Sequence, residues 1–166
     1  MNIPRFMRHL FATRWMTRRR FPAPVLEAIE KAIRQAEARH AGEIRFVIET
    51  ALDLPELLRE LPSRQRALQV FSLLGVWDTE HNNGVLIYLL LADRVVEIVA
   101  DRGIAAGVAQ AEWDTVCRAM EEHFRAGRFA EGSESGIRQV GELLARHFPS
   151  PRGAGGNELP NQPVLL

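Results

Sequence analysis

Cysteine is almost absent from this chain of 166 residues, because Cys117 is the only one. A single thiol cannot form a disulfide within the chain, and it cannot build a cysteine-based zinc site. This usage fits a reducing compartment, so we expect a cytoplasmic protein. Cys117 lies on the apolar stripe of a predicted helix, and we interpret it as a packing residue.

Long hydrophobic runs are missing as well. The longest uninterrupted apolar run covers residues 85–92, which suits a strand but not a membrane-spanning helix of roughly 18 residues. Near the N-terminus, Arg5, Arg8 and Arg14 interrupt the apolar residues, so we predict no signal peptide. Neither a Gly-rich phosphate loop nor a G-x-S-x-G nucleophile motif is present, and two common classes of enzyme site are therefore excluded.

Acidic residues are missing from positions 1–26, which contain six arginines; the first carboxylate belongs to Glu27. The whole chain has zero formal net charge, so its remainder is mildly acidic. Apolar residues recur at helical spacing through the basic segment: Ile3, Phe6, Met7, Leu10, Phe11 and Trp15. This amphipathic pattern suits a helix on an anionic membrane surface, a helix that docks on a protein partner, or a helix that packs on the domain's own core. We expect no nucleic-acid partner, because the basic residues do not extend into the domain.

The periodicity of the chain predicts three segments: a basic amphipathic segment (residues 1–20), an α/β domain (21–148) and a disordered tail rich in Pro, Gly and Asn (149–166). Within the domain we predict helices over 25–40, 55–76 (restarting at Ser63), 108–125 and within 129–148, and strands over 43–50, 84–91 and 95–100. The long connection between the first two strands predicts a parallel pair, and the short turn 92–94 predicts an antiparallel pair. The expected fold is a three-layer α/β/α sandwich in which helices flank both faces of a small mixed sheet.

Polar residues gather in two loops that this topology should bring together. Antiparallel pairing places the loop before strand 84–91 next to the loop that follows strand 95–100. The start of the next helix, near Asp114, is expected to approach them. Carboxylate and amide oxygens suit Ca²⁺ or Mg²⁺, and the candidate ligands are Asp78, Glu80, Asn82, Asn83 and Asp101. The alternative is an elaborate turn, since Asn and Asp favour turn conformations and His81 would then be an ordinary solvated histidine. An EF-hand is excluded, because Asn83 and Leu89 stand where its loop needs Gly and Glu.

Three stretches carry a resemblance to a known family: EARHAGEIRFVIE, HNNGVLIYLLLADRVVEIVADRGI and FRAGRFAEG. Over roughly residues 25–148 the chain resembles a TPM domain, the family of the thylakoid photosystem II repair proteins and of many bacterial proteins. The resemblance implies a small α/β/α sandwich. It also implies acid phosphatase activity and divalent-cation binding in some members, and roles in membrane-protein assembly in others.

The sequence departs from the family in one loop. Where the family commonly has G-Y-G-L-E-G, this chain has Asp101-Arg102-Gly103-Ile104-Ala105-Ala106. The change removes one expected ligand and adds a carboxylate. Many family members also carry a signal peptide and a membrane anchor, and we predict neither here.

Two hypotheses of function follow. The first is a non-enzymatic binding or assembly module that holds a divalent cation at the Asp78, Asn83 and Asp101 edge and that associates peripherally with the inner membrane through residues 1–20, or with a protein partner. The alternative is a metal-assisted acid phosphatase. In that case Asp78 and Asp101 would bind the cation, Arg102 would stabilise developing charge, and water would attack the phosphate ester. Neither hypothesis requires an organic cofactor.

Overall fold

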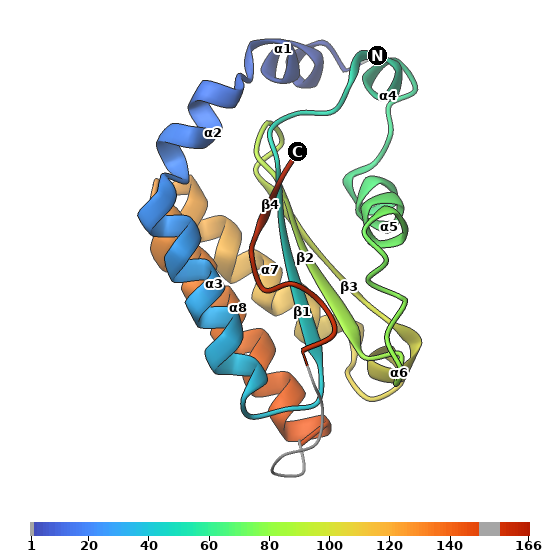
Figure 1. The fold of residues 1–166 in the computed structure, drawn as a ribbon. Coiled ribbons are helices and arrows are strands. Elements are labelled where there is room, and N and C mark those ends of the chain that lie inside the picture. Colours follow the sequence, from blue (N-terminus) through green and yellow to red (C-terminus); the bar gives the residue numbers. More distant parts are fainter. Residues whose placement is uncertain (1, 150–156) are drawn as a thin grey trace.

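A mixed β-sheet lies between two layers of helices in the computed structural model, which describes residues 2–149 and 157–166 (Figure 1). The strand order is β3-β2-β1-β4, in which β4 is the short C-terminal strand Val164–Leu165. β1 (Glu43–Glu49) and β2 (Gly84–Leu90) are parallel, and β2 pairs antiparallel with β3 (Val95–Ala100). Both pairings confirm the topology that the connection lengths predicted.

Helices cover both faces of this sheet. One layer contains α3 (Ala23–Glu37), α7 (Gln110–Arg125) and α8 (Phe129–His147). The other contains α4 (Leu54–Leu58) and α5 (Ser63–Leu73), and α5 packs on β2 and β3. The N-terminal helices α1 (Ile3–Phe11) and α2 (Arg14–Arg20) cross the end of the sheet instead of covering a face (Figure 1). The three-layer sandwich predicted from the sequence is therefore confirmed.

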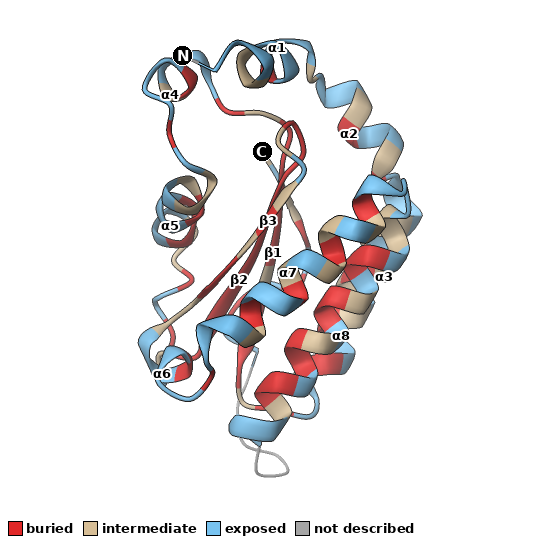
Figure 2. Cartoon of the chain, turned by 180° about the vertical axis from the view of Figure 1, so that it is seen from behind, coloured by how far each residue is buried: buried red, intermediate tan, exposed pale blue. Residues whose placement is uncertain are grey.

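The hydrophobic core is divided by the sheet into two parts. Side chains of β2 alternate between them: Val85, Ile87 and Leu89 face the three-helix layer, whereas Leu86, Tyr88 and Leu90 face α5. Every residue of β2 is buried, because a strand covered on both faces has no solvent side. Figure 2 shows that each helix of the three-helix layer has buried residues on the side toward the core and exposed residues on the outer side.

The tail differs from its prediction. Residues 149–166 were expected to be disordered, but β4 (Val164–Leu165) extends the sheet by pairing parallel with β1. Leu166 N donates to Ile48 O at 2.9 Å, and Arg45 donates to Gln162 O at 2.8 Å. The prediction is therefore wrong for residues 157–166. Composition alone did not reveal that β1 has an open edge whose backbone groups can bind the tail. Residues 150–156 lie outside the described part of the chain.

Two shorter segments also differ from expectation. Residues expected as a loop form the helix α6 (Arg102–Ala105), because Asp101 caps it by accepting from Arg102 N at 2.7 Å. The basic N-terminal segment forms two helices, which are separated where Ala12 and Thr13 adopt extended backbone angles. This break lets the segment bend around the end of the sheet.

Candidate functional site

Two loops far apart in the sequence meet where β2 begins and β3 ends. Asp101 N donates to Gly84 O at 2.8 Å, and Gly103 N donates to Asn82 O at 3.0 Å. The Arg102 guanidinium donates from Nε to Asn82 Oδ1 at 2.9 Å. A Cβ on Gly103 would lie 2.5 Å from Asn82 O, so this close approach requires glycine. The meeting of the loops is the one that antiparallel pairing predicted.

Three of the predicted cation ligands are exposed or engaged elsewhere. Asp78 and Glu80 are exposed to solvent, and Glu80 N donates to Glu158 Oε2 at 2.9 Å. The side-chain oxygen of Asn82 accepts the hydrogen bond from Arg102. Arg102, which we predicted to stabilise charge on a phosphoryl group, is itself exposed and held by this contact.

Asn83 and Asp101 are the predicted ligands whose unpartnered oxygen atoms are buried. Asn83 is buried and its Nδ2 donates to Ala41 O. Asn83 Oδ1 and Asp101 Oδ2 are buried without a hydrogen-bond partner in the described structure. Ca²⁺ and Mg²⁺ take about six or more oxygen ligands, yet no three His, Cys, Asp or Glu residues of the described chain lie close enough to hold a metal. The site thus fits a cation only in part, because water would have to supply most of the ligands. Cation binding stays a prediction.

Two further residues were expected near this edge. His81 is exposed in the loop. Asp114 is exposed on α7, where it accepts from Gln110 Nε2 at 2.8 Å. No hydrogen bond or ion pair joins Asp114 to the described residues of the two loops, so no such contact adds Asp114 to the edge. The edge therefore consists of two loops.

The N-terminal helices present their apolar side chains to solvent. The exposed fractions are 62% for Ile3, 41% for Met7, 60% for Leu10, 67% for Phe11 and 65% for Trp15. In contrast, the polar residues His9 and Thr17 are only 3% exposed. Phe6 alone of the apolar stripe packs, partly buried, against the core. Of the arrangements expected for this segment, packing of the whole stripe on the domain is therefore not observed. No helix in the described residues is long and apolar enough to span a bilayer.

Asp93, in the turn between β2 and β3, anchors the inner face of α1. Its carboxylate lies 2.8 Å from Arg5 Nε, 3.1 Å from His9 Nε2 and 3.3 Å from Arg8 Nη2. Burial disfavours the charged form of Asp93, but the hydrogen bonds and charges of His9 and Arg5 outweigh it and lower its pKa to about 2. Asp93 therefore stays ionised, and it holds α1 with its polar side inward.

The helix α2 is held on the domain by a hydroxyl pair and by aromatic packing. Thr17 Oγ1 and Thr50 Oγ1 are 2.7 Å apart in a buried contact. Phe21, at the end of α2, is 1% exposed and packs edge-on against Phe129 at 5.4 Å between ring centroids. The Arg20 guanidinium lies 5.2 Å from the centre of the same ring. Both ends of the N-terminal segment are thus fixed to the domain.

Comparison with known proteins identifies the family. The sequence profile of the TPM domain matches residues 21–143, which is most of the chain. The chain belongs to the TPM domain family. This TPM domain is similar to the BA42 protein of the psychrophilic bacterium Bizionia argentinensis, with 35% identity and a TM-score of 0.76, over 87% of this chain and 94% of that one. No curated protein matches the sequence.

Two more distant structures share the fold alone. One is the N-terminal domain of a protein from P. gingivalis, with 23% identity and a TM-score of 0.59 over 75% of this chain and 78% of that one. The other is the N-terminal domain of the cg2496 protein from Corynebacterium glutamicum, with 15% identity and a TM-score of 0.54 over 81% of this chain and 76% of that one. At these identities the likeness extends to the TPM fold and not to a function.

Sequence reasoning missed the residues at the opposite end of this TPM domain. Asp93 and Arg94 were interpreted only as part of the turn 92–94, and His9 was not singled out. One signal could have found them. A segment with six arginines and no acid must take its carboxylate partners from elsewhere in the chain. Asp93 is a candidate, because it lies in the predicted turn between two apolar strands.

Proposed function

We propose that this TPM domain is a non-enzymatic binding and assembly module that attaches peripherally to an anionic membrane surface through α1 and α2. The observation that carries the proposal is the outward position of Ile3, Met7, Leu10, Phe11 and Trp15. A run of exposed large apolar side chains on one helical segment is uncommon in a protein that has no partner for it. The domain had a core available to bury them, and it buries His9 and Thr17 there instead.

The charge around this face indicates which partner it suits. Arg14, Arg18 and Arg19 are exposed on α2, and none of them forms a salt bridge with a described residue. Residues 1–26 contain no carboxylate. Basic side chains beside inserted aromatic and aliphatic groups are typical of helices that lie in the interface of an anionic bilayer. The cytoplasmic leaflet of the inner membrane carries the negative surface potential that such a segment needs.

The anchoring of the segment supports attachment without a large rearrangement. Asp93 holds the inner side of α1, and Thr50 holds the inner side of α2. The apolar side chains therefore point outward before any membrane is met. Little ordering of the helices is then required on binding, which favours affinity.

The test is flotation of the full chain with vesicles of phosphatidylcholine, with or without phosphatidylglycerol. We expect binding only with the anionic lipid, and weaker binding at higher salt. Ile3→Ser with Leu10→Ser should reduce binding at least about tenfold, because two inserted side chains are lost. Leu58→Ser with Leu73→Ser is the matched control, since these leucines on the α4 and α5 side are similarly exposed, at 60% and 72%.

Two outcomes would remove the proposal: equal flotation with neutral vesicles, or equal loss of binding in the control pair. A third variant separates charge from apolar insertion. Arg14→Gln, Arg18→Gln and Arg19→Gln together should weaken binding about a hundredfold, at roughly 1 kcal/mol for each basic residue near the surface. Retention of full vesicle binding by this triple variant would show that these arginines do not recognise the anionic surface.

The spare oxygen atoms of Asn83 and Asp101 favour a second candidate function, which is divalent-cation binding at the loop edge. Ca²⁺ or Mg²⁺ held there mostly through water would add to the binding role and not replace it. We derive no phosphate-ester hydrolysis from this edge. Asp78 is exposed and Arg102 is committed to Asn82, so the groups assigned to the phosphatase alternative are not assembled around one point by any described contact.

A further inference from the structure

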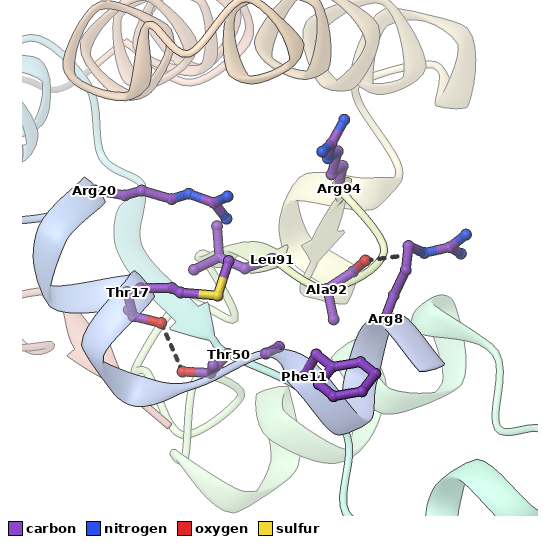
Figure 3. A pocket seen from close by; sticks show the side chains of 10 residues that line it. Arg8, Phe11, Thr17, Arg20, Thr50, Leu91, Ala92 and Arg94 are labelled. Atoms are coloured by element: carbon purple, nitrogen blue, oxygen red, sulfur yellow. Dashed lines mark hydrogen bonds between the residues drawn. The ribbon is translucent and has the colours of Figure 1, made fainter. Parts of the chain in front are cut away.

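A cavity of about 130 Å³ lies between the N-terminal helices and the end of the sheet (Figure 3). A second cavity of about 140 Å³ adjoins it, and both are lined by Arg20, Leu91 and Arg94. Since a water molecule needs only about 10–15 Å³ measured in this way, each space admits a group of the size of a phosphate. Figure 3 shows Arg20 reaching in from α2 above Leu91, and Arg94 rising from the β2–β3 turn.

The location in the fold is one where ligands commonly bind. Thr50 follows the carboxyl end of β1, and Leu91 follows the carboxyl end of β2. In α/β proteins with parallel strands, ligands bind outside these carboxyl ends, where the connecting segments diverge. Here the connections are capped by α1 and α2, which supply Phe11 and Met16 as an apolar wall. The opposite end of the sheet holds the loop edge described above, so the two locations are separate.

Two of the cations at this cavity are left without a carboxylate. Arg8 pairs with Asp93, and Arg125, which lines the second cavity, pairs with Glu121 at 2.9 Å. Neither Arg20 nor Arg94 forms a salt bridge with any residue of the described chain. Burial, and after it the charge of Arg94, lowers the pKa of Arg20. Arg20 and Arg94 therefore line one space, and no carboxylate of the described residues lines it with them.

The backbone of Arg94 gives an independent indication. Its φ of 57° lies in the left-handed region, where glycine is favoured and other side chains are strained. The arginine side chain forms no hydrogen bond or salt bridge with a described residue that would compensate for the strain. The hairpin turn uses a left-handed residue at this place, but it does not require an arginine.

We propose that Arg20 and Arg94 together bind a phosphate group in this cavity. The planar fork of each guanidinium matches phosphate oxygens, and two forks suit a dianionic phosphate monoester. Phe11, Met16 and Leu91 would contact the carbon part of the ester. The phosphate could belong to a lipid headgroup or to a soluble ester. This site goes beyond the membrane attachment proposed above and does not depend on it.

The experiment is a titration of the full chain, followed through the backbone amide signals of Leu91 and Arg94 by NMR. The probes are inorganic phosphate and glycerol phosphate, with acetate as the control anion. We expect saturable shifts with both phosphates and none with acetate. Arg94→Gly and Arg20→Met should each weaken binding about tenfold or more, because each removes a charge-assisted contact.

Suitable variants keep the test independent of folding. Glycine is the residue that the Arg94 backbone favours, and methionine retains the packing of Arg20 on Phe129. Arg118→Gln removes an equal charge from the exposed face of α7 and should leave binding unchanged. Equal weakening by Arg118→Gln, or shifts of equal size with acetate, would overturn the proposal.

A vesicle arm identifies the source of the phosphate. Phosphatidic acid presents a monoester, whereas phosphatidylglycerol presents a diester. If the ligand is a lipid, Arg94→Gly should lose the preference for phosphatidic acid but keep attachment to phosphatidylglycerol vesicles. If the ligand is a soluble ester, Arg94→Gly should weaken phosphate binding in the titration and leave vesicle binding unchanged. Ile3→Ser with Leu10→Ser should leave the titration unchanged, so failure of membrane attachment and failure of the phosphate site are told apart. Absence of saturable binding in both arms would overturn the site.

Discussion

His9 Nε2 lies 3.1 Å from Asp93 Oδ1 and connects the N-terminal helix to the β2–β3 turn. The other ring nitrogen, Nδ1, accepts a hydrogen bond from Leu52 N at 3.0 Å, so both ring nitrogens contact the domain. Because this contact is on the inner side of α1, Ile3, Met7 and Leu10 point outward. The orientation of the proposed membrane surface therefore depends on one half-buried carboxylate in a turn.

Asp93→Asn should lower the free energy of unfolding by about 2 kcal/mol, since the amide replaces an acceptor of charged hydrogen bonds. Urea denaturation of the variant and of the parent chain measures this difference in the free energy of unfolding. Asp114→Asn, exposed on α7, is the control and should change stability by no more than about 0.5 kcal/mol. The pKa of Asp93 is lowered from 3.8 to about 2, so its contribution is present above pH 3.8 and is lost as the pH falls through about 2. Equal effects of the two variants would contradict the anchoring role.

Arg94→Gly should raise the free energy of unfolding by about 1 kcal/mol, because it relieves a left-handed backbone without removing a protein contact. Glu60→Gly is a useful comparison. Glu60 has a φ of 53°, but its side chain accepts from Asn2 N at 2.9 Å, so the relief should be partly offset. The measurement is the thermal midpoint of each variant, compared with that of the parent chain. A lower midpoint for Arg94→Gly would mean that the arginine side chain stabilises the domain itself.

Arg66→Met should destabilise the domain by about 3–5 kcal/mol, since it leaves a buried carboxylate unpaired. Glu49 is 4% exposed, and Arg66 Nη2 lies 2.7 Å from its Oε1. Tyr88 donates its hydroxyl to the same carboxylate, and burial, followed by the charge of Glu49, raises the pKa of Tyr88. Adding Glu49→Gln to Arg66→Met should recover much of the loss, because the amide can still accept from Tyr88. No recovery in the double variant would show that packing, not charge, is responsible.

Docking of the tail should weaken as the pH rises through 7. Burial, opposed by the hydrogen bond from Ile44 N and aided by the charge of Glu43, raises the pKa of Glu37 from 4.5 to about 7. Glu37 accepts from Asn161 Nδ2 at 2.7 Å. A carboxyl group with a raised pKa stabilises the folded state fully below pH 4.5, and this contribution is lost as the pH rises through about 7.

Hydrogen exchange at the Leu166 amide, which donates to Ile48 O, reports this change. Protection, corrected for the intrinsic exchange rate, should fall between pH 5 and 8 in the parent chain. In Glu37→Gln it should vary much less, because the amide does not titrate. An unchanged pH dependence in Glu37→Gln would assign the effect to another group, and Glu43, whose pKa burial also raises, is the next to test.

A divalent cation at the loop edge should raise the thermal midpoint, because a ligand that binds only the folded state stabilises it by mass action. We expect a small rise with Ca²⁺ or Mg²⁺ at millimolar concentration, reversed by EDTA. Asp101→Asn should abolish it while keeping the cap of α6, since asparagine also caps helices. Glu134→Gln, exposed on α8, controls for net charge. A rise that persists in Asp101→Asn would place the cation elsewhere.

Much of the architecture could be predicted from local patterns. The alternation in EIRFVIET and the unbroken apolar run after Gly84 predicted β1 and β2, and connection lengths then dictated parallel and antiparallel pairing. The same topology predicted that Asn82 and Gly103 would meet. These predictions succeeded because strand pairing follows from chain connectivity. The tail failed, because Val164 and Leu165 are ordered by the open edge of β1 and not by their own propensity.

The direction of each side chain at the candidate sites depended on packing across the whole molecule. Sequence by itself determined the family, the layers and the basic amphipathic character of residues 1–20. It could not decide which side of that segment faces the domain, because hydrophobic periodicity predicts burial of the apolar stripe. Only the tertiary structure places Asp93 where a carboxylate can bind Arg5 and His9, and that pairing turns the apolar side to solvent. Likewise, Arg20 and Arg94 face one cavity only because α2 and the β2–β3 turn meet at the end of the sheet.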